Sequence, residues 1–278
     1  MFEKVLLATD LSPAHEVLIE SVLELKDKGT KEVVMTWVVN VQSAGTSAGE
    51  YRERHLNMLK EKGDLFEEAG LKVQYEAPIG FPSQEICITA QKKDADLIVI
   101  GSRGERGIRE MFLGSTTSNV IRMTTTPTLV ERIDVDRGSF KVACSRKFES
   151  LLLATDLSDN AREAEKMAMK LAPQAKKMVI VSVAETGIMG KTEPLESMDE
   201  LESMRKRFSQ VCHDVTLRLE KGIASENINR AAMEEESTLI IMGKRGIGGI
   251  KELLLGSTAE AVTRRSKKPV LLVPKKED

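Results

Sequence analysis

The sequence predicts an α/β protein made of two tandem doubly wound domains, each a parallel sheet flanked by helices. Three observations lead to this fold class. The chain has 278 residues, which is comfortable for two domains. Residues 6–12 (LLATDLS) recur letter for letter at 152–158, and the glycine-rich segment 101–116 recurs closely at 243–258. Within each half, short apolar runs alternate with segments of helical periodicity.

The expected strands include short apolar runs at residues 5–8 and 151–154, which suit strands buried on both faces of a sheet. In the first half they are residues 5–8, 33–39, 71–76, 97–100 and 128–131, and in the second half 151–154, 178–183, 215–220, 239–242 and 270–273. Strand and helix alternate throughout both halves, so each half is expected to fold as one doubly wound domain.

Helices are expected between these strands. Ser12 and Ser158 follow the first strand of each half and are placed to cap the next helix. Charged helices are expected near 51–69 and 195–210. We expect the domains at residues 1–134 and 151–278, joined by a linker at 135–150 that carries charge and glycine but no sustained apolar period.

Composition excludes several classes of function. The chain has 41 Lys and Arg against 43 Asp and Glu, a net charge of -2, which gives no electrostatic argument for a nucleic-acid or membrane partner. Aromatic residues make up 4%, so the core is expected to be aliphatic. Three scattered cysteines and three isolated histidines suggest buried thiols in a reducing compartment and no metal site. The sequence begins directly with a strand-like segment, so we expect a cytoplasmic protein.

Two places in each half lie at the carboxyl ends of strands, where ligands of doubly wound sheets bind. The first is the aspartate after strand one, Asp10 or Asp156. Its carboxylate can accept hydrogen bonds from a sugar hydroxyl or an amino group. An aspartate in this position can also serve only to start the helix, and taken by itself the residue favours that interpretation.

The second place is a glycine loop after strand four. Gly101-x-x-Gly104 is followed nine residues later by Gly114-Ser115-Thr116, and the second half repeats this spacing without a gap. Glycines let the backbone approach phosphate oxygens, and the helix that opens at the Gly-Ser-Thr step favours an anion at its N-terminus. Arg103, Lys244 and Arg245 add positive charge to the two loops. Two such loops, in register with two aspartates, indicate phosphate binding more strongly than one strand-to-helix turn would.

This glycine pattern, with an aspartate after strand one, resembles the universal stress protein family. The second loop and the following KPVLLVP, from Lys268 to Pro274, are similar to the closing segment of that family. The resemblance covers nearly the whole chain as two complete family domains. It implies an adenine nucleotide alpha hydrolase-like fold, with a five-stranded parallel sheet in each domain. For the branch that keeps these glycines it also implies binding of ATP or AMP, with or without Mg²⁺.

The resemblance further implies which residues contact the nucleotide. Asp10 and Asp156 are expected beside the adenosine, Val38 and Val183 at the adenine, and the glycine loops at the ribose and phosphates. The set in the first half is Ala8, Thr9, Asp10, Val38, Gly101, Arg103, Gly104, Gly114, Ser115, Thr116 and Thr117. The set in the second half is Ala154, Thr155, Asp156, Val183, Gly243, Arg245, Gly246, Gly256, Ser257 and Thr258.

The two halves depart from the family pattern in different ways. Trp37 and Ser182 stand where the family often has a histidine before the strand-two valine. Thr117 becomes Ala259 in the second half, which removes a hydroxyl within reach of a phosphate. We expect both sites to bind a nucleotide, with different affinities.

The leading function implied is a stress-response binding module that reports nucleotide binding through its conformation or its partners. Two alternatives remain, a slow ATPase or phosphotransferase and a nucleotide-free interaction scaffold. No general base or nucleophile is placed beside the phosphates, so at most weak hydrolysis is expected. In the family the edge strands pair between domains, which implies a pseudo-dimer of the two halves and allows a homodimer of chains.

Overall fold

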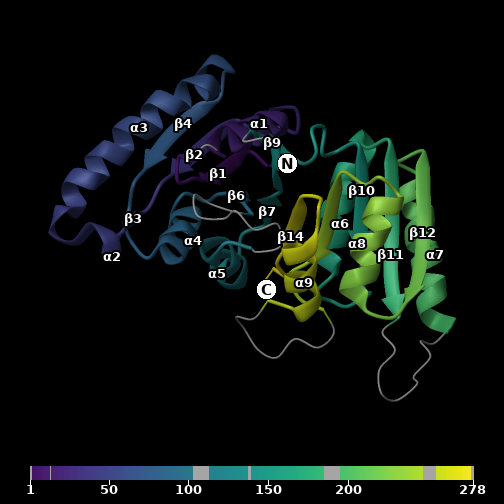
Figure 1. Cartoon of the computed structure of the whole chain (residues 1–278). Helices are drawn as coiled ribbons and strands as arrows, with labels where there is room; N and C mark the ends of the chain where they lie inside the picture. The colour runs from purple at the N-terminus through teal and green to yellow at the C-terminus, as the bar shows by residue number, and fades with distance from the viewer. Residues whose placement is uncertain are drawn as a thin grey trace. The chain divides into compact units, whose positions relative to one another are not determined.

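The computed structural model describes residues 2–12, 14–102, 113–136, 139–184, 195–246 and 255–276. The chain divides into two compact units, Met1–Ala143 and Cys144–Asp278. Each unit contains a five-stranded parallel sheet with helices packed against it (Figure 1). The two-domain α/β architecture expected from the repeat is therefore confirmed.

The first unit contains β1 (Lys4–Ala8), α1 (His15–Lys26), β2 (Glu32–Thr36), β3 (Val39–Asn40), α2 (Val41–Ala44), a 3₁₀ turn (Gly45–Ser47), α3 (Ala48–Glu68), β4 (Lys72–Glu76), β5 (Ile79–Gly80), α4 (Pro82–Lys92), β6 (Leu97–Gly101), α5 (Ser115–Met123), β7 (Thr128–Glu131), β8 (Ile133–Asp136) and β9 (Ser139–Val142). The second unit contains β10 (Ser150–Ala154), α6 (Arg162–Leu171), a 3₁₀ turn (Ala172–Gln174), β11 (Lys177–Ala184), α7 (Leu195–Ser209), β12 (Asp214–Lys221), α8 (Ala224–Glu234), β13 (Leu239–Gly243), α9 (Ser257–Arg265) and β14 (Val270–Val273).

The strand order of the sheets locates a binding crevice. The order is β7-β6-β1-β2-β4 in the first unit and β14-β13-β10-β11-β12 in the second. The chain moves outward from β1 through β2 to β4, and then returns to the other side of β1 to form β6. The strand order therefore switches between β1 and β6, and between β10 and β13. Ligands of open α/β sheets bind at the carboxyl ends of the strands beside such a switch.

The core is aliphatic, as the scarcity of aromatic residues predicts. Leu6, Leu7, Leu152 and Leu153 in the central strands are fully buried, which burial on both sheet faces requires. In the first unit α1 packs beside α3, and α4 packs beside α5. Figure 1 shows these pairs on opposite sides of the sheet. This two-sided cover fixes the ends of β1 and β6, where the crevice lies.

The second strand of the first unit is shorter than expected. Residues 33–39 were expected to form one strand, but β2 ends at Thr36 and the chain continues into the short β3, which pairs with β5. Pro78 lies between β4 and β5 and has no N–H to donate to the ladder. In the second unit, β11 and β12 pair without interruption over eight residues each. Pro78, in the segment between β4 and β5, accounts for the break.

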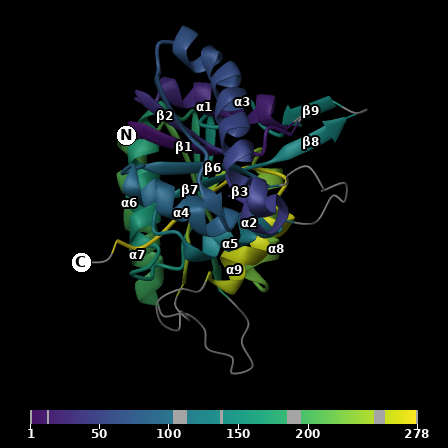
Figure 2. The same cartoon turned by 90° about the vertical axis from the view of Figure 1, so that its left-hand side faces the viewer.

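The segment expected to be a linker contains structure of its own. β8 and β9 form an antiparallel hairpin in which Ile133 lies opposite Val142. Figure 2 shows this hairpin extending beyond the sheet of the first unit. The boundary between the two compact units follows the hairpin, after Ala143.

Two expectations about helix starts have different outcomes. The Gly-Ser-Thr steps do open helices, because Gly114 and Gly256 are the N-cap residues of α5 and α9. Neither Ser12 nor Ser158 is the N-cap residue of the first helix of its half, although Ser158 Oγ accepts a hydrogen bond from the backbone N of Ala161 at 3.3 Å. Those helices begin three or more residues later, after Ala14 and Ala161, with no side-chain cap.

The expectation of buried thiols is confirmed, because Cys87, Cys144 and Cys212 are all buried. Among the described helices, none combines the length and the apolar character needed to cross a bilayer.

Candidate functional site

The turn after the first strand has the same construction in both units. Asp10 Oδ1 accepts a hydrogen bond from the backbone N of Ser12 at 3.0 Å, and Leu11 N donates to Thr9 Oγ1 at 3.0 Å. Leu11 has a φ of 50°, a left-handed conformation that is uncommon for leucine. The backbone N–H of Ser12 is therefore part of this turn, and Ser12 is not the N-cap of α1. Residues held in such conformations cluster at functional sites.

The second unit repeats this turn closely. Asp156 Oδ1 accepts hydrogen bonds from the Ser158 backbone N at 3.1 Å and from Ser158 Oγ at 2.6 Å. Leu157 has a φ of 59°, and its N–H donates to Thr155 Oγ1. The sequence offers no signal for these two left-handed leucines, because leucine does not favour that region.

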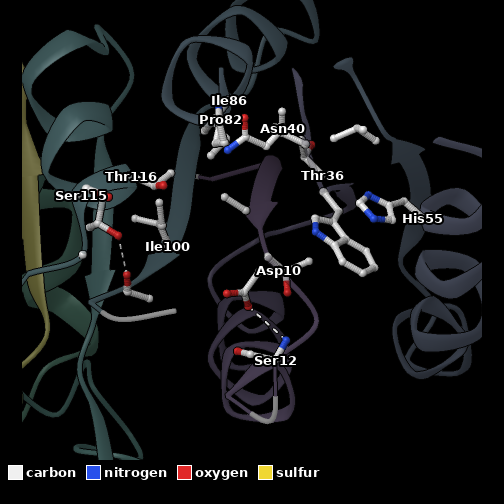
Figure 3. Close-up of a pocket in the computed structure, with 18 of the residues that line it drawn as sticks. Asp10, Ser12, Thr36, Asn40, His55, Pro82, Ile86, Ile100, Ser115 and Thr116 are labelled. Carbon is white, nitrogen blue, oxygen red and sulfur yellow. Dashed lines mark hydrogen bonds between the residues drawn. The ribbon is translucent and has the colours of Figure 1, made fainter. Parts of the chain in front are cut away.

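A pocket of about 700 Å³ opens beside the turn of the first unit. Its volume lies within the range of small-molecule sites, about 300–1,000 Å³. Figure 3 shows Asp10 and Ser12 at one end, Ser115 and Thr116 along one side, and His55 on the opposite side. Nine of the residues expected in the first site line this pocket: Ala8, Thr9, Asp10, Val38, Gly101, Gly114, Ser115, Thr116 and Thr117. The other two, Arg103 and Gly104, lie outside the described residues.

The N-terminus of α5 forms one edge of the pocket. Ser115 is exposed there, and Gly114 N donates to the Ser102 carbonyl at 2.9 Å, which ties the start of the helix to the end of β6. Thr117 is buried, and its hydroxyl donates to the Gly101 carbonyl at 2.7 Å. The hydroxyl of Thr117 therefore holds α5 to β6 in this structure, and the free amides of the first turn are the groups available to an anion.

The pocket also has an aromatic wall that sequence reasoning missed. The rings of Trp37 and His55 are stacked with centroids 3.5 Å apart and planes 4° apart, and Tyr51 meets His55 edge-on at 6.4 Å. All three residues line the pocket. Burial lowers the pKa of His55, an effect that the backbone of Trp37 opposes in part. The imidazole is therefore neutral near pH 7 and stacks as an uncharged ring.

His15 is a second residue that could not be placed at the site from the sequence. It is buried below the turn, with Nδ1 2.9 Å from Thr9 Oγ1. Burial lowers its pKa to about 4, with a further contribution from Lys62 and an opposing one from Asp10. A neutral His15 therefore supports the threonine of the turn.

In the second unit the glycine loop folds against the turn. A Cβ atom at Gly246 would collide with the carboxylate of Asp156, so a larger residue there would displace that side chain. Asn160 Nδ2 donates to the Gly246 carbonyl at 3.0 Å, and Gly256 N donates to the Lys244 carbonyl at 2.9 Å. These contacts bring Asp156, Gly246 and the start of α9 together.

The remaining expected residues of the second site occupy the same edge of its sheet. Ala154 and Gly243 end β10 and β13, Val183 lies near the end of β11, and Ser257 and Thr258 begin α9. Gly243 lies close to the backbone of Arg245 and Asn160. Thr155 differs from Thr9 in its partner, because its hydroxyl donates to Glu165 at 2.8 Å. Burial raises the pKa of that glutamate.

Comparison with known proteins agrees with this architecture. A model of the Universal stress protein family matches residues 1–132 and 147–274. Universal stress protein MJ0577 of Methanocaldococcus jannaschii is 28% identical over 153 residues, which cover 47% of this chain and 94% of that protein. Universal stress protein Slr1230 of Synechocystis is 24% identical over 274 residues, covering 96% of this chain and 88% of that protein.

Solved structures include a similar full-length arrangement. The crystal structure of a universal stress protein from Archaeoglobus fulgidus has a TM-score of 0.80 and 26% identity, covering 99% of this chain and 100% of that chain. Both the sequence match over two segments and the full-length structural match require two copies of one domain. The chain therefore belongs to the universal stress protein family, as a tandem member with two family domains.

Proposed function

We propose that this chain is a stress-response binding module whose ligand is an adenine nucleotide, ATP or AMP. The observation that carries the proposal is the pocket of about 700 Å³ in the first unit. It brings a carboxylate turn, apolar strand residues and the N-terminus of a helix to one cavity at the switch in strand order. The match to the family over both halves supports the proposal, because it covers the segments that form the pocket.

Each part of the pocket suits one part of a nucleotide. The exposed Asp10 carboxylate accepts a hydrogen bond from Ser12 N, and a carboxylate has enough acceptor sites to accept from ribose hydroxyls as well. The first-turn amides of α5 and the Ser115 hydroxyl can hold phosphate oxygens. Val38 and Ile86 give an apolar surface for a base. The residues present therefore fit the group.

The described side chains provide no separate metal site, because no three His, Cys, Asp or Glu among them are grouped to hold an ion. Mg²⁺ would accompany ATP through the phosphate oxygens. Slow hydrolysis of ATP or phosphotransfer remains the alternative activity, and a nucleotide-free scaffold the third possibility.

The proposal is tested by mass spectrometry of small molecules released from the protein as purified, followed by calorimetry with AMP and ATP. We expect adenine nucleotides in the extract and saturable binding. Turnover of ATP by the full chain and by the Gly114→Ala, Gly256→Ala double variant separates the alternatives. Loss of hydrolysis in that variant would favour the enzyme, and hydrolysis unchanged by it would come from elsewhere. If the extract contains no adenine nucleotide and calorimetry shows no binding, the nucleotide-free scaffold is the function that remains.

The expected association states remain predictions. A pseudo-dimer of the two halves and a homodimer of chains follow only from the resemblance to the family. Light scattering of the purified chain tests the second, and a strict monomer would rule it out.

A further inference from the structure

The residues at the end of the second strand differ between the two units. In the sheet of the first unit, Thr36 lies opposite Ala8, and Trp37 follows it. In the second unit Val181 lies opposite Ala154, and Ser182 follows. The register therefore makes Thr36 equivalent to Val181 and Trp37 equivalent to Ser182. The first unit has a hydroxyl and an indole where the second has an aliphatic group and a small polar one.

Thr36 carries a buried polar atom that lacks a partner. Its side chain is 1% exposed, lines the pocket, and Oγ1 has no hydrogen-bond partner. An unpaired hydroxyl in a buried position is unfavourable, so such atoms are rare unless a ligand or water completes their hydrogen bonds. Figure 3 shows Thr36 between Asn40 and His55, on the side of the pocket opposite Ser115 and Thr116. This is the side away from the helix N-terminus.

Trp37, the next residue along the chain, lines the same pocket and is held in a defined position. His55 covers one face of the indole at 3.5 Å in a nearly parallel stack, and the Trp37 backbone N donates to the Glu76 carbonyl at 3.0 Å. The residue is half-buried, and its pocket-lining surface is what remains for a ligand. Aromatic rings held in this way are platforms for flat heteroaromatic groups, and polar atoms at their margin select the edge of such a group.

We propose that Thr36 and Trp37 form a base-recognition element present in the first unit only. The indole of Trp37 contacts the face of a heteroaromatic base, and the Thr36 hydroxyl hydrogen-bonds its polar edge. The second unit, with Val181 and Ser182, binds through ribose and phosphate without this contribution. The inference rests on the proposed function and adds to it which part of the ligand each unit recognises.

The single tryptophan of the chain makes the first unit directly observable. The full chain is titrated with adenosine, AMP and ribose 5-phosphate while the emission of Trp37 is recorded. We expect adenosine and AMP to quench the emission and ribose 5-phosphate to leave it unchanged. Quenching of equal size by ribose 5-phosphate would overturn the proposal, because the base would then play no part.

Variants separate recognition from folding, with affinities measured by calorimetry. Thr36→Val introduces the side chain found in the second unit, and we expect it to weaken AMP binding about fivefold. Trp37→Leu is expected to weaken it about tenfold or more, and Trp37→Phe to retain most of the affinity. Neither Thr36→Val nor Trp37→Leu should change the affinity for ribose 5-phosphate. Ser182→Ala is the matched control and should leave the AMP affinity unchanged. Thermal unfolding midpoints confirm that each variant is folded.

The outcomes distinguish this inference from the function on which it rests. If the unaltered chain binds AMP but Thr36→Val and Trp37→Leu keep its ratio of AMP to ribose 5-phosphate affinity, the base-recognition element is refuted and nucleotide binding stands. If the unaltered chain binds no adenine nucleotide, both are refuted.

Discussion

At the scale of single residues, His15 links the site to the stability of the first unit. It is buried with a pKa lowered to about 4 from a usual value of 6.5, chiefly by desolvation. The unfolded chain therefore takes up a proton at this residue before the folded chain does, and stability falls as the pH drops from about 6.5 to 4. The loss approaches about 3 kcal/mol. Urea unfolding at pH 7, 5 and 4 measures it.

The control for this prediction is the variant His15→Ala. Position 15 corresponds in the repeat to position 161, where the second half has alanine. The variant is expected to be less stable at pH 7, because a buried ring and its bond to Thr9 are lost. Its stability should nevertheless vary less between pH 6.5 and 4. An equal pH dependence in both proteins would show that other groups are responsible.

The same scale shows the limit of prediction from the sequence. Asp10, Gly114 and Ser115 could be predicted as neighbours because strand ends in a parallel sheet meet at one edge. Trp37 and His55 could not, because their contact joins the end of a strand to the middle of α3, and no periodicity reports such a pair. The unpaired hydroxyl of Thr36 likewise becomes visible only when burial and partners are known.

At the scale of elements, the N-terminus of α5 allows the phosphate contact to be tested without breaking the helix. Ser115→Asp places a carboxylate in the first turn, where it favours the helix by about 0.3–1 kcal/mol. The same charge repels a phosphate held by the first-turn amides. We expect AMP affinity to fall about tenfold or more while adenosine affinity changes little. Calorimetry with both ligands measures this.

Ser257→Asp at the start of α9 is the matched control for that variant in the second unit. It should weaken the second binding event and leave quenching of Trp37 by AMP unchanged. If Ser115→Asp lowered adenosine and AMP affinity equally, the helix terminus would have a structural role rather than a phosphate-binding one.

The long helix α3 provides a paired stability test. A Cβ atom at Gly63 would collide with the ring of Tyr75 on β4, whose hydroxyl donates to Glu67 at 3.0 Å. Gly49, in the same helix, has open space around it. We expect Gly49→Ala to stabilise the chain by about 0.5–1 kcal/mol through helix propensity. Gly63→Ala should destabilise it by about 1–2 kcal/mol, because the ring must move. Equal effects in urea unfolding would contradict the packing of α3 on β4.

The elements themselves were largely predictable from periodicity, and their differences have local causes. The expected strand ranges overlap every strand of the two main sheets. The break after Thr36 was not predictable from its own segment, because the proline that interrupts the ladder is Pro78, in the segment between β4 and β5. The serine caps failed because the left-handed Leu11 and Leu157 turn the chain before the helix can begin. The hairpin in residues 133–142 carries no sustained apolar period in the sequence.

At the scale of the whole molecule, the two units share the backbone features of the site and differ in the side chains around them. Both units keep the aspartate turn, its left-handed leucine, and a glycine N-cap at the helix that faces the site. They differ at Thr36 and Val181, and at Thr117 and Ala259. Anion binding at a helix N-terminus depends on backbone groups, so we expect it in both units, whereas the proposed base recognition depends on side chains and is expected in the first unit only.

Because both units keep the aspartate turn and the helix N-terminus, we expect two nucleotides per chain at saturation, bound with unequal affinity. Calorimetry with AMP should show two events, and Asp10→Ala and Asp156→Ala should each remove one of them. The event that remains in Asp156→Ala should quench Trp37, since it occurs in the first unit. The event that remains in Asp10→Ala should not quench it. One nucleotide per chain at saturation would contradict the prediction, because the preserved turn and helix terminus of one unit would then be insufficient to form a site.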